Sequence, residues 1–311
     1  MRRAAVAMAL MAAGPLGAQT LTVPGPAGPL EGQAIAVPGA AHAVVIVPGS
    51  GPTDRDGNSA ATGLRSDAYR LLAEGLAAAG VASIRIDKRG FGGSARAVAD
   101  PNTVTIADYA EDVAAWVEVG RTLAPCVWVG GHSEGAVVAL VAAGQGVEGL
   151  CGLVLLTPPG RPLGTILLDQ LRANPGVAPF MDELERIVRG LEDGALTEPA
   201  AMSEPLRPFL PVDLQRFMVD LFGYDPAAAA AAWEGPALIV SATADLQLSA
   251  EDADILARAM PQARMLVLEG ATHVLKTDVP GAPLATYTDP AIPLHPDLVP
   301  GIVAFLEETA P

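Results

Sequence analysis

Short runs of consecutive apolar residues alternate with segments of helical periodicity along most of the chain. Runs such as AVVIV at 43–47 and VWVGG at 127–131 are short and continuous, which is typical of strands buried on both faces. Segments 67–80 and 105–123 carry apolar residues at helical spacing. Strands and helices that alternate in this way form a mostly parallel sheet flanked by helices. The pattern therefore predicts an α/β fold.

The alternation stops between the sixth and the seventh expected strand. Residues 161–233 contain only helical signals, interrupted by prolines, and strands and helices then alternate again to the end of the chain. A helical insertion at such a point is typical of a lid over a binding site. We therefore expect a core formed by residues 19–160 and 234–311, with a helical cap at 161–233.

The first residues have the layout of a secretory signal peptide. Two arginines precede an apolar stretch, a Gly-Pro pair interrupts it, and small residues follow at a cleavage position near residue 18. We expect residues 1–18 to be removed and the protein to be exported, periplasmic or secreted; the alternative is a buried N-terminal helix. No later stretch has the length and hydrophobicity of a membrane span.

The charge of the chain narrows the range of its partners. With 35 acidic against 19 basic side chains, the formal net charge is −16. An acidic surface repels phosphate backbones and anionic lipids, so the charge disfavours nucleic-acid and membrane-surface binding. A small-molecule substrate fits this composition. The sequence carries no signal for the oligomeric state.

Two cysteines begin two neighbouring predicted strands, at Cys126 and Cys151. Adjacent strand starts bring Cα atoms within the range of a disulfide, and an exported protein matures in an oxidising compartment. We therefore expect a structural disulfide, with two buried thiols as the alternative.

A serine lies between glycines where a predicted strand meets a predicted helix. Gly131-His-Ser133-Glu-Gly135 follows the strand at 126–130, and a small-residue helix begins directly after it. In this setting a GxSxG motif holds the serine Oγ clear of the sheet on a strained turn. A tight turn with a capping serine is the alternative. We interpret Ser133 as a nucleophile.

A nucleophilic serine needs a base and an acid that orients the base. His273 follows a late strand and lies at the sheet edge where sites gather; the other histidines, which lack this position, are His42, His132 and His295. Asp245 follows the preceding strand, whereas Asp252 and Asp254 lie on the next helix and are expected to be solvated. We therefore predict a triad of Ser133, Asp245 and His273.

Acyl transfer also needs donors for an oxyanion. One is expected to be the backbone N–H of Glu134, and the other that of Ser50, with Gly51 as second choice, in the glycine-rich loop after the strand at 43–47. The loop lacks a P-loop lysine and a GxGxxG pattern, so we expect no nucleotide. Neither a metal nor an organic cofactor is required by this chemistry.

These motifs resemble the α/β-hydrolase superfamily over nearly the whole mature chain. GHSEG, the DKRGFGGS loop at 87–94 and the late Asp and His are similar to the branch of monoglyceride-lipase-like and serine-aminopeptidase-like hydrolases. PGSGPTDRDGN, THVLK and PLHPDLV resemble its secreted, esterase-like members. The resemblance implies the same nucleophile, acid, base and oxyanion amides. One departure is Pro48-Gly49, where many relatives have His-Gly.

The leading interpretation is a serine hydrolase that cleaves carboxylic esters. An exopeptidase or amidase is the second, because the cap carries carboxylates that could face a free amine, namely Asp182, Glu183, Glu185 and Glu192. The solvated face of a helix is the alternative, and the favoured, interpretation of these four residues. A catalytically idle, exported binding protein on a hydrolase scaffold is the third.

Two further expectations concern the surroundings of the site. Lys88 and Arg89 are expected to pair with Asp54 and Asp56. Apolar cap residues are expected either to line the substrate pocket or to form the core of the cap; examples are Phe180, Phe209 and Met218.

Overall fold

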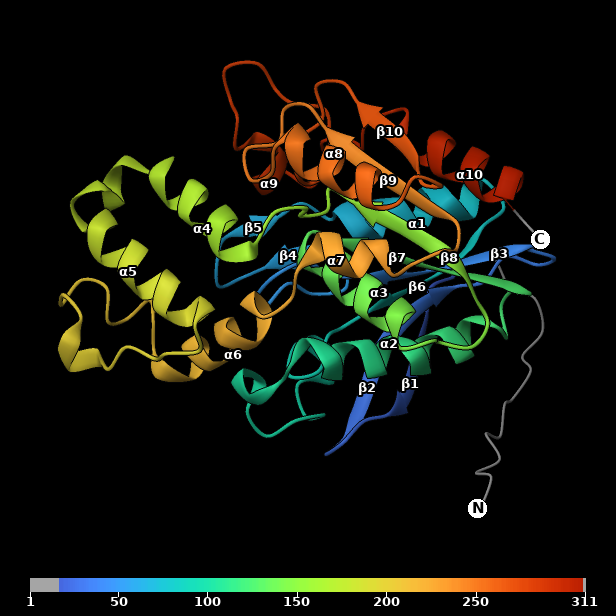
Figure 1. Ribbon diagram of the computed structural model, residues 1–311. Coiled ribbons are helices and arrows are strands. Elements are labelled where there is room, and N and C mark those ends of the chain that lie inside the picture. The colour runs from blue at the N-terminus through green and yellow to red at the C-terminus, as the bar shows by residue number, and fades with distance from the viewer. Residues whose placement is uncertain (1–16, 310–311) are drawn as a thin grey trace.

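A central sheet of eight strands organises the computed structural model, which describes residues 17–309 (Figure 1). In spatial order the strands are β1 (Gln19–Pro24), β2 (Pro29–Ile35), β6 (Ala82–Ile86), β3 (His42–Val47), β7 (Cys126–His132), β8 (Leu150–Leu156), β9 (Ala237–Ala242) and β10 (Arg264–Leu268). β2 runs antiparallel to β1 and β6, and the other neighbouring pairs are parallel. The predicted mostly parallel sheet is confirmed.

Helices cover both faces of this sheet (Figure 1). One hydrophobic cluster packs α2 (Ile106–Gly120), α3 (Glu134–Gly144) and α8 (Ala250–Ala259) on one face, and another packs α1 (Ala68–Ala78) and α10 (Leu298–Thr309) on the other. Successive residues of β3 contribute to opposite clusters, Val44 to the second and Val45 to the first. Both faces are buried, which explains the continuous apolar runs of the central strands.

Local capping explains where two of the helices begin or end. The Thr105 hydroxyl accepts from the Asp108 N–H, and the Asp108 carboxylate accepts from the Thr105 N–H, so α2 begins with a capping box. Gly80, directly after α1, has φ +87°, a conformation that glycine adopts without strain.

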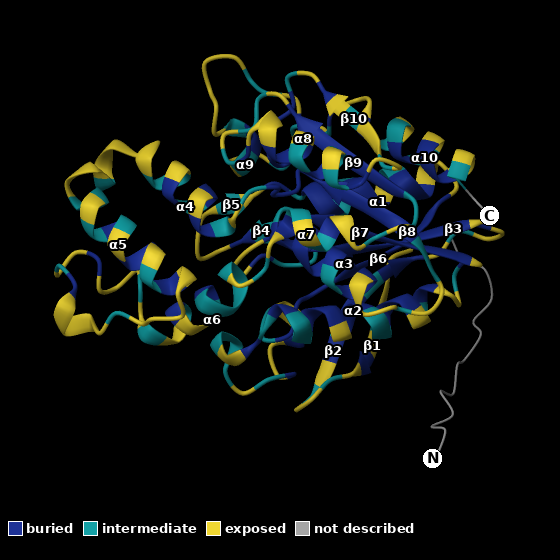
Figure 2. Ribbon diagram, viewed as in Figure 1, coloured by how far each residue is buried: buried dark blue, intermediate teal, exposed yellow. Residues whose placement is uncertain are grey.

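The insertion between β8 and β9 consists of α4 (Leu163–Arg172), α5 (Met181–Glu192), α6 (Val212–Phe222) and α7 (Pro226–Ala231). Helices α4 and α5 extend beyond the sheet, and Figure 2 shows much of their outer surface exposed. Buried residues of α5 and α6 share a hydrophobic cluster of their own with Met202 and Leu206, whereas α7 packs on the core through Ala230.

The remaining elements are short and lie in connecting segments. They are the hairpin of β4 (Asn58–Ser59) and β5 (Leu64–Arg65), helix α9 (Ala285–Thr288), and 3₁₀ turns at Gly92–Ser94, Pro101–Thr103, Pro175–Phe180 and Pro199–Ala201. Within residues 17–309, no helix combines the length and the hydrophobicity needed to cross a bilayer. Residues 1–16, most of the predicted signal peptide, lie outside the described residues.

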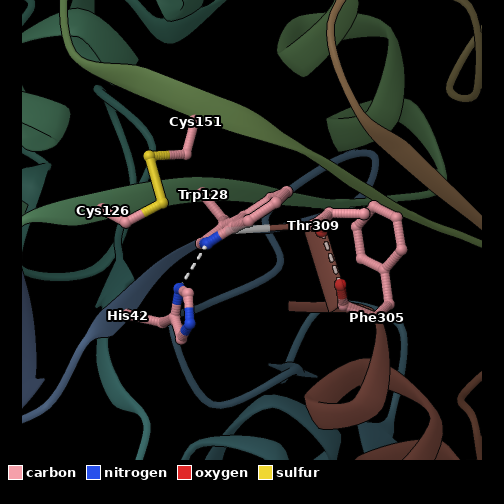
Figure 3. Close-up of a disulfide and its surroundings, with 6 residues drawn as sticks. All are labelled: His42, Cys126, Trp128, Cys151, Phe305 and Thr309. Atoms are coloured by element: carbon pink, nitrogen blue, oxygen red, sulfur yellow. Dashed lines mark hydrogen bonds between the residues drawn. A yellow bond between two sulfur atoms is a disulfide. The ribbon is translucent and has the colours of Figure 1, made fainter. Parts of the chain in front are cut away.

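A disulfide joins the first residue of β7, Cys126, to Cys151 in β8, with Cα atoms 5.6 Å apart (Figure 3). Next to it, the Trp128 indole N–H donates to His42 Nδ1 at 3.1 Å, and the Trp128 ring meets Phe305 edge-on. The cross-link therefore lies at the amino ends of β7 and β8, opposite the edge that carries the motif serine.

Candidate active site

Ser133 stands at the turn between β7 and α3 with φ 54° and ψ −122°, a strained conformation for a residue with a side chain. The two motif glycines permit this turn. A Cβ on Gly135 would lie 2.5 Å from the Val47 carbonyl oxygen, and one on Gly131 would lie 2.7 Å from the Cα of Ala136. The spacing GxSxG is therefore a steric requirement of the turn.

Asp245 and His273 meet at the same edge of the sheet. Asp245 lies in the loop after β9 and His273 in the loop after β10, and His273 Nδ1 lies 2.8 Å from Asp245 Oδ2. Both side chains are buried. The other carboxylate oxygen accepts from the N–H groups of Gln247 and Leu248 at 2.7 and 3.0 Å. Hydrogen bonds to both carboxylate oxygens thus fix the position of Asp245.

The pKa of Asp245 is lowered by these contacts. Burial by itself would raise this pKa, but the charge and hydrogen bond of His273 and the two backbone N–H groups outweigh it. Asp245 is therefore an anion at neutral pH, suited to hold a hydrogen on His273 Nδ1 and to leave Nε2 as the basic nitrogen.

Ser133 and His273 line one cavity of about 560 Å³. Of the three residues assigned to a triad, Asp245 and His273 are in contact, and His273 lines the same cavity as Ser133. The ring of His273 also lies 4.7 Å, centroid to centroid, from that of His132, the chain neighbour of Ser133.

Ser50 and Glu134 line a second cavity, of about 370 Å³, together with Ser133. The loop that carries Ser50 approaches the serine closely, because a Cβ on Gly49 would lie 3.3 Å from the Ser133 Cβ. Among residues 17–309, no protein acceptor takes a hydrogen bond from the N–H of Ser50 or Glu134. Both amides are therefore available to a ligand at Ser133.

The two cavities meet at Ser133, and apolar atoms form most of the accessible lining of both. The smaller one runs beneath the cap and is mainly apolar; its lining includes Phe91, Leu163, Ile166, Leu214, Phe217, Met218 and Leu221. The lining of the larger one includes more residues with hydroxyl or amide side chains, among them Thr53, Thr62, Gln247 and Thr288. Such an apolar pocket beside a few polar groups is typical of a small-molecule site.

The expectation for Lys88 is wrong. Instead of Asp54 or Asp56, Lys88 Nζ donates to the Gly49 carbonyl at 2.7 Å and to Glu134 Oε1 at 2.9 Å. Asp54 accepts instead from backbone N–H groups of its own loop. Lys88 therefore lies at the site, where it lines the smaller cavity.

The expectation for Arg89 is wrong as well. Its guanidinium pairs with Asp108 and Asp112 of α2, at 2.9 and 2.7 Å, because the loop after β6 turns toward that helix. Asp56 pairs with Arg85 of β6.

The expectation of solvated carboxylates on the helix after β9 is wrong for Asp252 and confirmed for Asp254, which is exposed. Asp252 is fully buried; it accepts from the backbone N–H of Gly160 and Arg161 and pairs with the Arg161 guanidinium, where the chain leaves the core for α4. None of the four cap carboxylates lines either cavity, and each is exposed or half-buried, which agrees with the alternative of a solvated helix face: Asp182, Glu183, Glu185 and Glu192. Glu183 accepts from Ser203, and Glu185 pairs with Arg172.

The expectation for the apolar cap residues is confirmed for Met218, which also belongs to the cap cluster, and for Phe180, and it is wrong for Phe209. Met218 lines the apolar cavity, Phe180 packs in the cap cluster, and Phe209 is exposed. Within residues 17–309, no group of three or more His, Cys, Asp or Glu side chains is arranged to hold a metal ion.

Tyr69 and His132 are site residues that the sequence analysis missed. The Tyr69 hydroxyl lies 2.7 Å from His132 Nδ1, and His132 Nε2 lies 2.8 Å from the His273 carbonyl. Burial, and next the charge of His273, lower the pKa of His132 to about 3, so this imidazole is neutral. Its position beside Ser133 was a usable signal, whereas nothing in the pattern of α1 distinguishes Tyr69.

Comparisons with known proteins agree with this architecture. The sequence profile of the alpha/beta hydrolase family matches residues 44–286. Esterase EstD of Thermotoga maritima is 28% identical over 241 residues, which are 75% of this chain and 54% of that protein. The chain thus spans about half the length of this curated relative.

Two solved structures share the fold at low identity. An esterase of Pyrococcus furiosus aligns with a TM-score of 0.57 and 18% identity over 97% of this chain and 96% of that one. A thermophilic esterase of Thermogutta terrifontis aligns with 0.59 and 18% identity over 94% of this chain and 100% of that one. With the profile match over most of its length, the chain belongs to the alpha/beta hydrolase family.

Proposed function

We propose that this protein is an esterase that hydrolyses carboxylic esters through an acyl-enzyme on Ser133. The observation that carries the proposal is the buried Asp245–His273 pair, 2.8 Å apart, beside the cavity that holds the strained Ser133. Names of similar proteins agree, because the curated relative and both of the solved structures described above are esterases.

The proposed reaction has two steps. His273 Nε2 takes the proton of Ser133 Oγ, which attacks the acyl carbonyl carbon and forms a tetrahedral oxyanion. The N–H groups of Ser50 and Glu134 stabilise that oxyanion, and His273 then gives its proton to the departing alkoxide. In the second step His273 takes a proton from water, whose oxygen attacks the acyl carbon; when the bond to Ser133 Oγ breaks, His273 returns the proton to Oγ, and the acid and free Ser133 are released.

The two cavities support an assignment of the two halves of the ester. Removal of apolar surface from water favours an acyl chain in the apolar cavity beneath the cap. The larger cavity is assigned to the alcohol, because His273, which gives its proton to the departing alkoxide, lines this cavity and not the other, and side chains such as Gln247 and Thr288 offer it polar groups. We therefore propose fatty-acyl esters of polar alcohols as the substrate class.

The peptidase interpretation lacks a carboxylate for the substrate amine. Glu134 is the carboxylate that lines the apolar cavity in the described chain, and it is already paired with Lys88. Comparison of aminoacyl-naphthylamides with short acyl esters tests this point, with turnover of the esters expected to dominate.

Substitution of the nucleophile tests the esterase proposal directly. We expect Ser133→Ala to lose at least about 10⁴-fold in kcat on p-nitrophenyl esters, as serine nucleophiles do when removed. A fluorophosphonate probe should label the wild type and not the variant. Hydrolysis by Ser133→Ala at the wild-type rate would refute the proposal, and an unlabelled, inactive wild type would favour an idle binding protein.

We also propose that the protein is exported, as the layout of residues 1–18 predicts. The Cys126–Cys151 disulfide supports this, because such bonds persist in oxidising compartments. Amino-terminal sequencing of the protein recovered from the periplasm or medium should give a start near residue 19. Recovery of the intact chain in the cytosol would contradict the proposal.

A further inference from the structure

Lys88 is a buried cation that the proposed reaction does not use. It donates to the Gly49 carbonyl at 2.7 Å and to the Glu134 carboxylate at 2.9 Å, and both side chains of this ion pair are 2% exposed. Burial of two charges costs several kcal/mol per ion before they attract each other, so packing alone is a poor reason for the pair. Because Glu134 follows Ser133, the cation joins the loop after β3 to the nucleophile turn.

The peptide unit that Lys88 contacts also contains the Ser50 N–H. No peptide bond in residues 17–309 is cis, so the Gly49 carbonyl and the Ser50 N–H point in opposite directions from one plane. A hydrogen bond that holds the carbonyl therefore fixes the direction of the N–H. A positive charge at the carbonyl oxygen also polarises the amide and makes its N–H a stronger donor.

A second side chain holds the other polar atom of Gly49. The Gly49 N–H donates to the Tyr69 hydroxyl at 3.1 Å, and that hydroxyl donates to Nδ1 of the neutral His132 at 2.7 Å. Gly49 is thus held at its N–H and at its carbonyl. The anchors run to His132 on one side of Ser133 and to the residue after Ser133 on the other.

We propose that Lys88 is a positioning residue of the oxyanion hole. Lys88 acts through the Gly49–Ser50 peptide: it fixes the orientation of the Ser50 N–H and strengthens it as a donor to the oxyanion formed at Ser133. This inference rests on the proposed esterase function, and it makes Ser50, not Gly51, the second oxyanion donor. Lys88 therefore stabilises the transition state, in which the oxyanion forms, and has little effect on the binding of the ground-state ester.

The test removes the cation without leaving a buried, unpaired carboxylate. In Lys88→Met/Glu134→Gln both charges are absent, so the penalty for an orphaned ion does not arise. We expect kcat on p-nitrophenyl butyrate to fall about 100-fold, the lower end for loss of one oxyanion donor, with KM within about threefold of wild type. Lys88→Gln, a milder variant that keeps a neutral donor, should lose about tenfold in kcat.

A transition-state analogue provides a readout that a merely structural role would not change. A trifluoromethyl ketone forms a tetrahedral adduct with Ser133 that carries an oxyanion, so its inhibition constant should rise in parallel with the loss of kcat. The matched control is Arg89→Met/Asp112→Asn, which removes a neighbouring buried ion pair from the same loop. We expect this control to lose stability but to keep kcat within about threefold of wild type.

Three results would overturn the inference while the esterase proposal survives. They are a folded Lys88 variant with wild-type kcat, a rise in KM with kcat and the inhibition constant unchanged, and an equal loss of kcat in the control pair. Retained activity of Ser133→Ala would instead refute the esterase proposal. Circular dichroism and the melting temperature of each variant establish that the protein is folded.

Discussion

Acidification is expected to destabilise the folded chain through His132, which is buried and neutral between Tyr69 and the His273 carbonyl. Its pKa is about 3 in the folded protein, against about 6.5 for a histidine in an unfolded chain. As the pH falls below 6.5, the unfolded chain binds a proton that the folded chain does not. The neutral His132 therefore makes its full contribution to the free energy of unfolding above about pH 7, and this contribution is lost progressively as the pH falls toward 3.

The size of the loss in stability follows from the pH range between the two pKa values of His132. Each pH unit below 6.5 costs about 1.4 kcal/mol while the folded imidazole stays neutral. Because pH 5 lies about 1.5 pH units below 6.5, the free energy of unfolding is lower there by about 2 kcal/mol than at pH 7.5. Asp245, whose pKa is lowered from 3.8, loses its stabilising effect only at lower pH, outside this range.

The assay compares the pH dependence of two proteins. The free energy of unfolding is measured by urea titration at pH 7.5, 6.0 and 5.0 for the wild type and for His132→Gln, whose amide can still donate to the His273 carbonyl. His42, whose pKa burial also lowers, contributes equally to both proteins. The wild type should lose about 2 kcal/mol more than the variant between pH 7.5 and 5.0. Equal losses in the two proteins would show that His132 is protonated without cost.

Three further substitutions have distinct expected effects. Gly135→Ala puts a Cβ 2.5 Å from backbone of β3, so stability should fall by about 1–3 kcal/mol and kcat should fall with it; normal kinetics and melting temperature would contradict the steric argument. Replacing Cys126 and Cys151 by Ser opens a loop of sequence separation 25, and urea unfolding should show a loss of about 3.5 kcal/mol with activity at 25 °C retained. Phe217→Ala enlarges the apolar cavity and should shift the kcat/KM optimum of a p-nitrophenyl ester series to longer acyl chains; an unchanged optimum would place the acyl chain elsewhere.

Much of the fold follows from the sequence because its signals are local. Continuous apolar runs indicate buried strands, and the carboxyl ends of neighbouring parallel strands meet at one edge, so loops as distant in sequence as those of Ser133, Asp245 and His273 converge there. The need for glycine at both motif positions of the turn also follows from the sequence, because a side chain at either position would crowd the strained serine.

The partners of long side chains did not follow from the sequence. Lys88 and Arg89 were assigned to the wrong carboxylates because their reach spans several elements, and the choice among many acids depends on packing that a linear pattern does not encode. Asp252 was expected in solvent because helical periodicity does not reveal that Arg161 returns to cover it. In the cap, the pattern predicts helices but not which of their faces meets the cavity.

The outer part of the cap has a hydrophobic cluster of its own, whereas the base of the cap packs on the body. α5 and α6 share the outer cluster, while α7 and partly buried side chains of α4 and α6 pack against the core. Two polar contacts, Arg161 on Asp252 and Asp220 on the Ile106 N–H, add to these contacts. Substitutions within the outer cluster can therefore alter the cap without disturbing the packing around Asp245 and His273.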